Sequence, residues 1–155
     1  MESAGTRDES EAERLDRNWE DILQELRVTL TGTQVMTGFL LALAFQQRFT
    51  ELNDLQVDLY LVLVALAALS TGLGMAPVIL HRTFFRQQKK AHVVSLGSRL
   101  LFAELIIVGV LAIGVTTFIF DFVIGHPAGV IAAIVSTAII AVLWIVLPQL
   151  RRRDT

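Results

Sequence analysis

Two carboxylates fall inside apolar sequence, where an ionisable side chain can bind a proton or a cation. Glu104 and Asp121 are the only charged residues of the stretch 100–124. Burying a carboxylate in hydrocarbon is costly without a partner, so each is a candidate site. At 1.5 Å per residue, each lies about 6 Å from one end of the stretch. Two interpretations are open: interfacial carboxylates that are solvated or ion-paired, with Arg99 beside Glu104, or a proton- or cation-binding site.

Gln34 is the third polar candidate, in the most polar of the apolar stretches. On a helical wheel it shares one arc with Thr29, Thr31, Thr33, Thr37 and Gly38, and the remainder holds Val35, Met36, Phe39, Leu40 and Leu43. We expect the polar arc to face other helices and the apolar arc to face lipid. The Gln34 amide then either bonds across a helix interface or belongs to a polar pathway for ions.

Other site chemistry has no support in the sequence. No cysteine is present, which excludes disulfides and thiolate ligands. His81, His92 and His126 lack the spacing of metal ligands and are expected to be solvated, and no glycine-rich phosphate loop or activated serine occurs. We therefore predict no enzyme activity, no catalytic residue, no metal and no cofactor. The only basic loop is short, so we expect no nucleic-acid partner.

Four apolar stretches must position these candidates. They cover residues 28–45, 59–80, 100–124 and 130–147, and each is near or above the roughly 17–25 residues that cross a bilayer. The chain is too short for a second folded domain. The predicted fold is all-α: an integral membrane four-helix bundle with up-down-up-down topology, spanning residues 28–148, with the lipid bilayer as its surroundings.

The basic residues predict the orientation of the bundle. Of the two connections 46–58 and 125–129, only the first contains a basic residue, Arg48, whereas the segments 1–27, 81–99 and 149–155 are rich in arginine or lysine. The positive-inside rule places these three segments in the cytoplasm. We thus expect a multi-pass protein of the bacterial cytoplasmic (plasma) membrane, with a basic tail at 149–155 and both termini cytoplasmic. The first 27 residues lack the pattern of a cleavable signal peptide.

The segment 1–27 carries nine acidic residues against four arginines. An apolar stripe runs through it at helical spacing, formed by Leu15, Trp19, Ile22, Leu23 and Leu26. This pattern predicts an N-terminal amphipathic cytoplasmic helix from about residue 8. Its acidic face either packs near the basic segment 82–90 or is simply solvated, and both interpretations remain open.

Small residues recur at intervals of four in two spans. They are Ala68, Gly72 and Ala76 in the second span, and Gly129, Ala133, Thr137 and Ala141 in the fourth. Such a face lets two helix backbones approach closely, so we expect both faces to lie in helix–helix seams. The connection 125–129 is a tight turn, which makes the third and fourth spans antiparallel neighbours.

Several stretches carry a family resemblance. They are 25–34 (ELRVTLTGTQ), 38–41 (GFLL), Phe45, Arg48, Phe49, 60–61 (YL), 76–78 (APV), 81–82 (HR), 85–86 (FR), Trp144 and Pro148. Over about residues 15–150 the chain resembles a family of small four-span bacterial membrane proteins, chiefly actinobacterial, classed as a domain of unknown function. Members are sometimes labelled sodium:proton antiporters. The resemblance implies the fold and a membrane location.

Two hypotheses for function follow. The first is a small accessory protein that works by interaction, with a second copy or another membrane protein as its partner. The alternative is a minimal oligomeric ion- or proton-coupled transporter, similar to an antiporter. The small multidrug-resistance exporters also have four spans, but they place an essential glutamate deep in the first span, where this chain has Gln34 and threonines. Antiporters generally use discontinuous helices and a carboxylate at mid-depth. These differences favour the accessory hypothesis.

Overall fold

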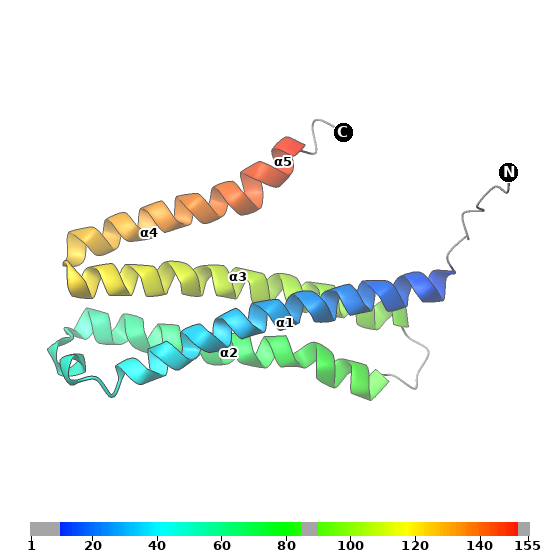
Figure 1. Cartoon of the computed structure of the whole chain (residues 1–155), viewed down its shortest axis with the longest axis horizontal. Coiled ribbons are helices and arrows are strands. Elements are labelled where there is room, and N and C mark those ends of the chain that lie inside the picture. Colours follow the sequence, from blue (N-terminus) through cyan, green and yellow to red (C-terminus); the bar gives the residue numbers. More distant parts are fainter. Residues whose placement is uncertain (1–9, 85–89, 152–155) are drawn as a thin grey trace, which may run out of the picture.

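The structure, a computed structural model, describes residues 10–84 and 90–151. Four long helices run antiparallel to their neighbours in the chain: α1 (Glu11–Leu43), α2 (Asp54–Phe84), α3 (Lys90–Val123) and α4 (His126–Ala141) (Figure 1). A short 3₁₀ helix, η1 (Gln47–Glu51), follows α1, whereas α4 runs on through a π-helical turn, η2 (Val142–Val146), into α5 (Leu147–Arg151). The described residues contain no strand, so the predicted all-α class is confirmed.

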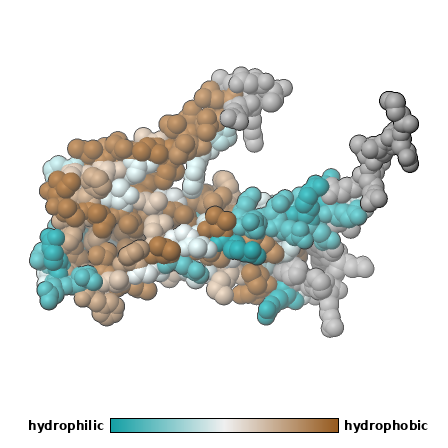
Figure 2. Space-filling model, viewed as in Figure 1, coloured by the Kyte–Doolittle hydropathy of each residue, from teal (hydrophilic) through white to brown (hydrophobic). Residues whose placement is uncertain are grey.

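Each long helix is long and apolar enough to cross a membrane. The candidate spans are Glu13–Leu43, Asp54–Leu80, Val93–Val123 and His126–Leu150. Figure 2 shows apolar residues over most of the visible face, with hydrophilic residues gathered over the first part of α1 and over the connection from α1 to α2. We name the end of the bundle that holds the α1–α2 and α3–α4 connections the hairpin end, and the opposite end the terminal end. The chain is a small membrane protein by this pattern.

The helices α1, α2 and α3 pack against one another, whereas α4 packs along α3 alone. In Figure 1, α4 diverges from the other helices toward the terminal end. Gly125, with φ of 126°, makes the tight turn from α3 to α4, as the sequence predicts. Near the other end of this seam, the Trp144 ring lies on Gly109, where an added Cβ would come within 3.0 Å of it.

The acidic N-terminal segment and the first span form one helix. The helix α1 begins after Ser10, which caps it through a reciprocal pair of hydrogen bonds with Glu13 (Ser10 Oγ accepts from Glu13 N at 3.3 Å), and it continues through the predicted boundary at 27–28 without a break. Its stripe is buried against α3 rather than against lipid, in a cluster of Trp19, Ile22, Leu26, Val93 and Leu101. The Trp19 ring packs directly on Gly97 of α3, where any side chain would collide with the ring.

This contact accounts for a difference in length. The third helix begins at Lys90, well before the predicted start at residue 100, because Val93 and Gly97 extend its packing face for α1. The predicted pairing of the acidic face with residues 82–90 falls largely on 85–89, which lie outside the described residues.

A second core cluster lies toward the hairpin end. It consists of Leu40, Tyr60, Leu63, Ala67, Leu111 and Phe118. The Tyr60 hydroxyl donates to the Leu40 carbonyl at 3.0 Å, which satisfies the hydroxyl and fixes the register between α1 and α2. Leu40 was assigned to the lipid-facing arc by the helical wheel, and that assignment is wrong because the side chain is 2% exposed.

The predicted seam of α2 is also wrong within the chain. Ala68 and Gly72 are exposed, and a Cβ placed on Gly72 would have no atom within 4 Å. The helix instead turns Ala67, Ser70 and Gly74 inward. Leu30 of α1 packs on Gly74, and Leu63 packs on Gly114 of α3 in the same manner. Gly74 and Gly114, rather than Ala68 and Gly72, therefore let the helices approach closely. Ser70 has a polar partner on the other side of the seam.

The small-residue face of α4 meets α3 in part. On α4, Gly129 is buried, Ala133 and Ala141 are partly buried, and Thr137 is exposed. Ala76, the third small residue predicted for the α2 seam, is partly buried. Ala132 completes the buried surface of α4. The packing face of α4 is therefore rotated slightly from the one that the spacing predicts.

Candidate functional site

Glu104 of α3 is completely buried. Its side chain is 0% exposed, and the hydroxyl of Ser70, also 0% exposed, donates to Oε1 at 2.5 Å. The second oxygen, Oε2, has no hydrogen-bond partner among the described residues. Arg99 is exposed and forms no ion pair with Glu104. The expectation of a solvated or Arg99-paired Glu104 is therefore wrong, because the carboxyl is enclosed in the bundle and its one hydrogen bond among the described residues comes from Ser70 of α2.

A third polar residue lies at the same level of the bundle. The contacts Leu30–Gly74 and Tyr60–Leu40 set the antiparallel register of α1 and α2, and this register places Thr33 level with Ser70. Thr33 is 1% exposed. Its hydroxyl donates to the Thr29 carbonyl at 3.0 Å, so it has no proton left to offer Glu104. Thr33, Ser70 and Glu104 form a buried polar layer, with Glu104 Oε2 as its free acceptor.

Two cavities near the hairpin end are separate from this layer. One, of about 370 Å³, is lined by Leu43, Gln46, Gln47, Arg48, Phe49, Leu52, Phe118 and Phe122. The other, of about 490 Å³, lies between α1 and α3 and is lined mainly by apolar side chains, Met36 and Val115 among them. No residue of the buried polar layer lines either cavity.

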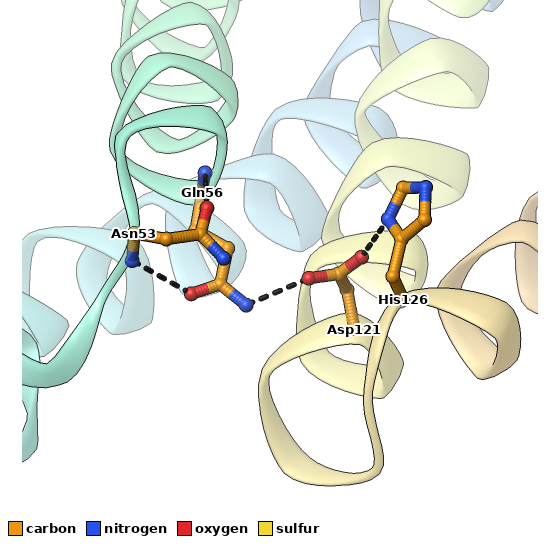
Figure 3. A network of polar contacts seen from close by, with 4 residues as sticks. All are labelled: Asn53, Gln56, Asp121 and His126. Carbon is orange, nitrogen blue, oxygen red and sulfur yellow. Dashed lines mark hydrogen bonds and ion pairs between the residues drawn. The ribbon is translucent and has the colours of Figure 1, made fainter.

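Asp121 is the centre of a polar network at the hairpin end (Figure 3). Gln56 Nε2 donates to Oδ1 at 2.7 Å, and His126 Nδ1 lies 2.8 Å from Oδ2. Gln56 is itself held by Asn53, which caps α2: Gln56 N donates to Asn53 Oδ1 at 2.9 Å and Asn53 N donates to Gln56 Oε1 at 3.1 Å. Asparagine is one of the residue types that commonly cap a helix in this way.

This network joins three helices. Gln56 belongs to α2, Asp121 to α3 and His126 to the start of α4, and both carboxylate oxygens have a partner. Gly129 makes room for it, because a Cβ there would lie 2.9 Å from Asp121 Oδ2. The Asp121 side chain is 11% exposed, so it is mostly enclosed rather than solvated, which was one of the interpretations left open, and His126 is paired as well as solvated. The geometry is that of a structural clamp.

Gln34 is exposed on α1, against expectation. The threonines Thr29, Thr31, Thr33 and Thr37 each donate to the carbonyl four residues earlier on the same helix, so the polar arc does not bond across a seam. No hydrogen bond joins the Gln34 amide to any other residue within 10–84 and 90–151. Gly38, one turn further along, is exposed too, with no atom within 4 Å of an added Cβ.

Sequence reasoning missed two partners. Ser70 is the only serine of the second span, a signal that was available, but nothing in the sequence pairs it with Glu104. Arg48 lies over the Phe122 ring, 4.7 Å from its centroid, while its Nε bonds Glu51 Oε2 at 3.0 Å. The side chains of His81 and His92 lie outside the described residues. Within the described part of the chain, no three His, Cys, Asp or Glu residues are close enough to hold a metal ion.

Comparison with known proteins gives one match. No curated protein and no solved structure matches the chain. The match to a sequence family covers residues 8–148, which include α1 to α4 and every polar group described above. The chain belongs to DUF6328, a family of unknown function.

Proposed function

We propose that this protein is a small multi-pass membrane protein that works by binding another membrane-spanning helix, as an accessory or interaction protein without catalysis. The observation that carries the proposal is the exposed, unpartnered Gln34 amide. We also propose that it resides in the bacterial plasma membrane with both termini cytoplasmic, on the strength of its basic residues.

The depth of Gln34 gives the observation its weight. At 1.5 Å per residue, the side chain lies about 10 Å along α1 from Arg27 and about 18 Å from Gln46, within the hydrocarbon layer. An amide without a hydrogen bond in an apolar medium costs roughly 2–7 kcal/mol. Lipid tails offer it nothing, so a polar group from outside this chain is the natural partner.

A photo-crosslinking amino acid placed on α1 tests this proposal in living cells. Position 38 lies one turn from Gln34 on the same side of α1, whereas position 39 is exposed on another side of the helix. We expect a protein adduct from position 38 and only lipid adducts from position 39, with the adduct identified by mass spectrometry. Absence of any protein adduct from position 38 would remove the proposal.

A second candidate function is a minimal ion- or proton-coupled transporter, and the free Oε2 of Glu104 favours it. A buried carboxyl with one unpartnered oxygen is the kind of group that binds a proton or a small cation. Two observations count against it. Neither cavity reaches Glu104, and the carboxyl lies about 25 Å along α3 from Asp121, near one side of a hydrocarbon layer of about 30 Å.

Proton flux in proteoliposomes separates the two functions. The wild type is assayed for collapse of a pH gradient on addition of sodium or potassium, beside Glu104→Gln and Asp121→Asn. Under the interaction function we expect no cation-dependent flux from any of the three. Flux from the wild type that is lost in Glu104→Gln and kept in Asp121→Asn would establish the transporter instead.

A further inference from the structure

The partner of Gln34 follows from the chemistry of its amide and from its surroundings. A primary amide carries an acceptor oxygen and a donor NH₂ group side by side. Two facing glutamines can therefore satisfy each other, with Nε2 of each donating to Oε1 of the other. A two-fold symmetric pair presents the same surface twice, which is the arrangement that brings a residue opposite its own copy.

The surface around Gln34 has room for a second helix. Gly38 lies on the same side of α1, one turn along, and an added Cβ there would meet nothing within 4 Å. Leu30, one turn in the other direction, packs on Gly74, so Gln34 lies on the side of α1 that borders α2. The register of α1 and α2 puts Gln34 level with Ala68, which is exposed and small, and Gly72 beside it is exposed as well.

The open groove of α1 does not include Gln34. This groove lies between α1 and α3 and is lined from α1 by Met36, Phe39 and Leu43. Gln34 lies on another side of α1, the one that borders α2, and it is exposed there. No hydrogen bond satisfies the amide within residues 10–84 and 90–151.

We propose that two copies of this protein pair through the α1 surface of Thr31, Gln34 and Gly38, with the two Gln34 amides hydrogen-bonded to each other within the membrane. This pairing rests on the proposed interaction function and names its partner. The two copies share one orientation in the membrane, so identical residues meet at the same depth. Ala68 and Gly72 of α2 flank the pair and let the second α1 approach.

The pairing can be tested by disulfide crosslinking, because the chain has no cysteine and any introduced thiol is the only one in it. Gly38→Cys and Thr31→Cys are each placed in the full-length protein, reconstituted in lipid vesicles and treated with a mild oxidant. A disulfide needs Cα atoms within about 7 Å, so it reports the α1–α1 approach. We expect disulfide-linked dimers from both variants. Phe39→Cys, exposed on another side of the same helix, is the matched control and should stay monomeric.

The role of Gln34 itself is tested by replacement within the Gly38→Cys protein. We expect the fold to tolerate Gln34→Leu because the side chain is exposed on α1 and makes no hydrogen bond within the described residues, so a loss of dimer reports the amide. We expect dimer affinity, measured by dilution into increasing lipid, to fall roughly threefold to thirtyfold. Gln34→Asn should retain most of the affinity.

Three results would overturn the pairing. One is equal crosslinking at positions 38 and 39, which would show that α1 has no preferred face. Another is unchanged dimer affinity in Gln34→Leu. The third is a position-38 photo-adduct in cells that contains a different protein and no second copy, which would leave the interaction function intact while removing this partner.

Discussion

The Gln56 side chain donates to Asp121 Oδ1 across 2.7 Å, and this hydrogen bond ties the α1–α2 hairpin to the α3–α4 hairpin at the end that holds their connections. The two residues are 65 positions apart in sequence. Each is also held by a neighbour, Gln56 by Asn53 and Asp121 by His126, so the bond is made between side chains that are already oriented (Figure 3).

We predict that Gln56→Leu weakens the fold through this contact. The change leaves Asp121 Oδ1 enclosed and unpaired, which costs about 1–3 kcal/mol of unfolding free energy. Thermal unfolding in detergent is the measurement. Gln47→Leu, an exposed amide at the same end of the bundle, is the control and should have little effect. Equal losses from the two changes would show that the network does not hold the hairpins together.

A second prediction concerns Ser70 and Glu104. Ser70→Ala leaves both Glu104 oxygens without a partner and should lower the unfolding free energy by about 1–3 kcal/mol. Replacing both residues by apolar ones, Ser70→Ala with Glu104→Met, should recover most of that loss, since no buried polar group then lacks a partner. Thr71→Val, which removes a hydroxyl bonded within its own helix, serves as the control. A double variant less stable than Ser70→Ala alone would contradict this interpretation.

The glycines of α2 give a third prediction. Gly74→Leu should destabilise the chain by roughly 1–3 kcal/mol, because Leu30 already fills the space that the new side chain needs. Gly72→Leu, two residues away on the same helix, points into open space and should leave intrachain stability nearly unchanged. The melting temperature of the monomeric fraction in detergent compares them. The reverse order would restore the face of Ala68, Gly72 and Ala76 as the intrachain seam.

A fourth prediction concerns orientation. A reporter fused after Thr155 should be active in the cytoplasm, and a tag inserted beside Asn53 or His126 should be labelled by a membrane-impermeant reagent from outside the cell. The reason is that the basic residues lie mainly in the segments at the opposite end from those two. Labelling of the Asn53 tag only after permeabilisation would reverse the arrangement.

The four helices and their antiparallel order were predictable from the sequence alone, because both depend on local properties. Mean hydropathy over a window of residues decides whether a segment can span a bilayer. A connection as short as the one at Gly125 requires α4 to pack antiparallel beside α3. The Asn53 cap and the apolar stripe through Trp19 are likewise local patterns that survive in the fold.

The side of each helix that faces inward was decided by tertiary structure. In hydrocarbon, Leu40 and Gly72 face lipid or protein at similar cost, so periodicity of apolar and small residues does not identify the seam. The seam of α2 is set by complementary shapes on other helices, with Leu30 on Gly74, and by one polar match, Ser70 with Glu104. Each of those contacts joins residues far apart in sequence. The same packing leaves Gln34 on the outside, where its amide has no partner among the described residues.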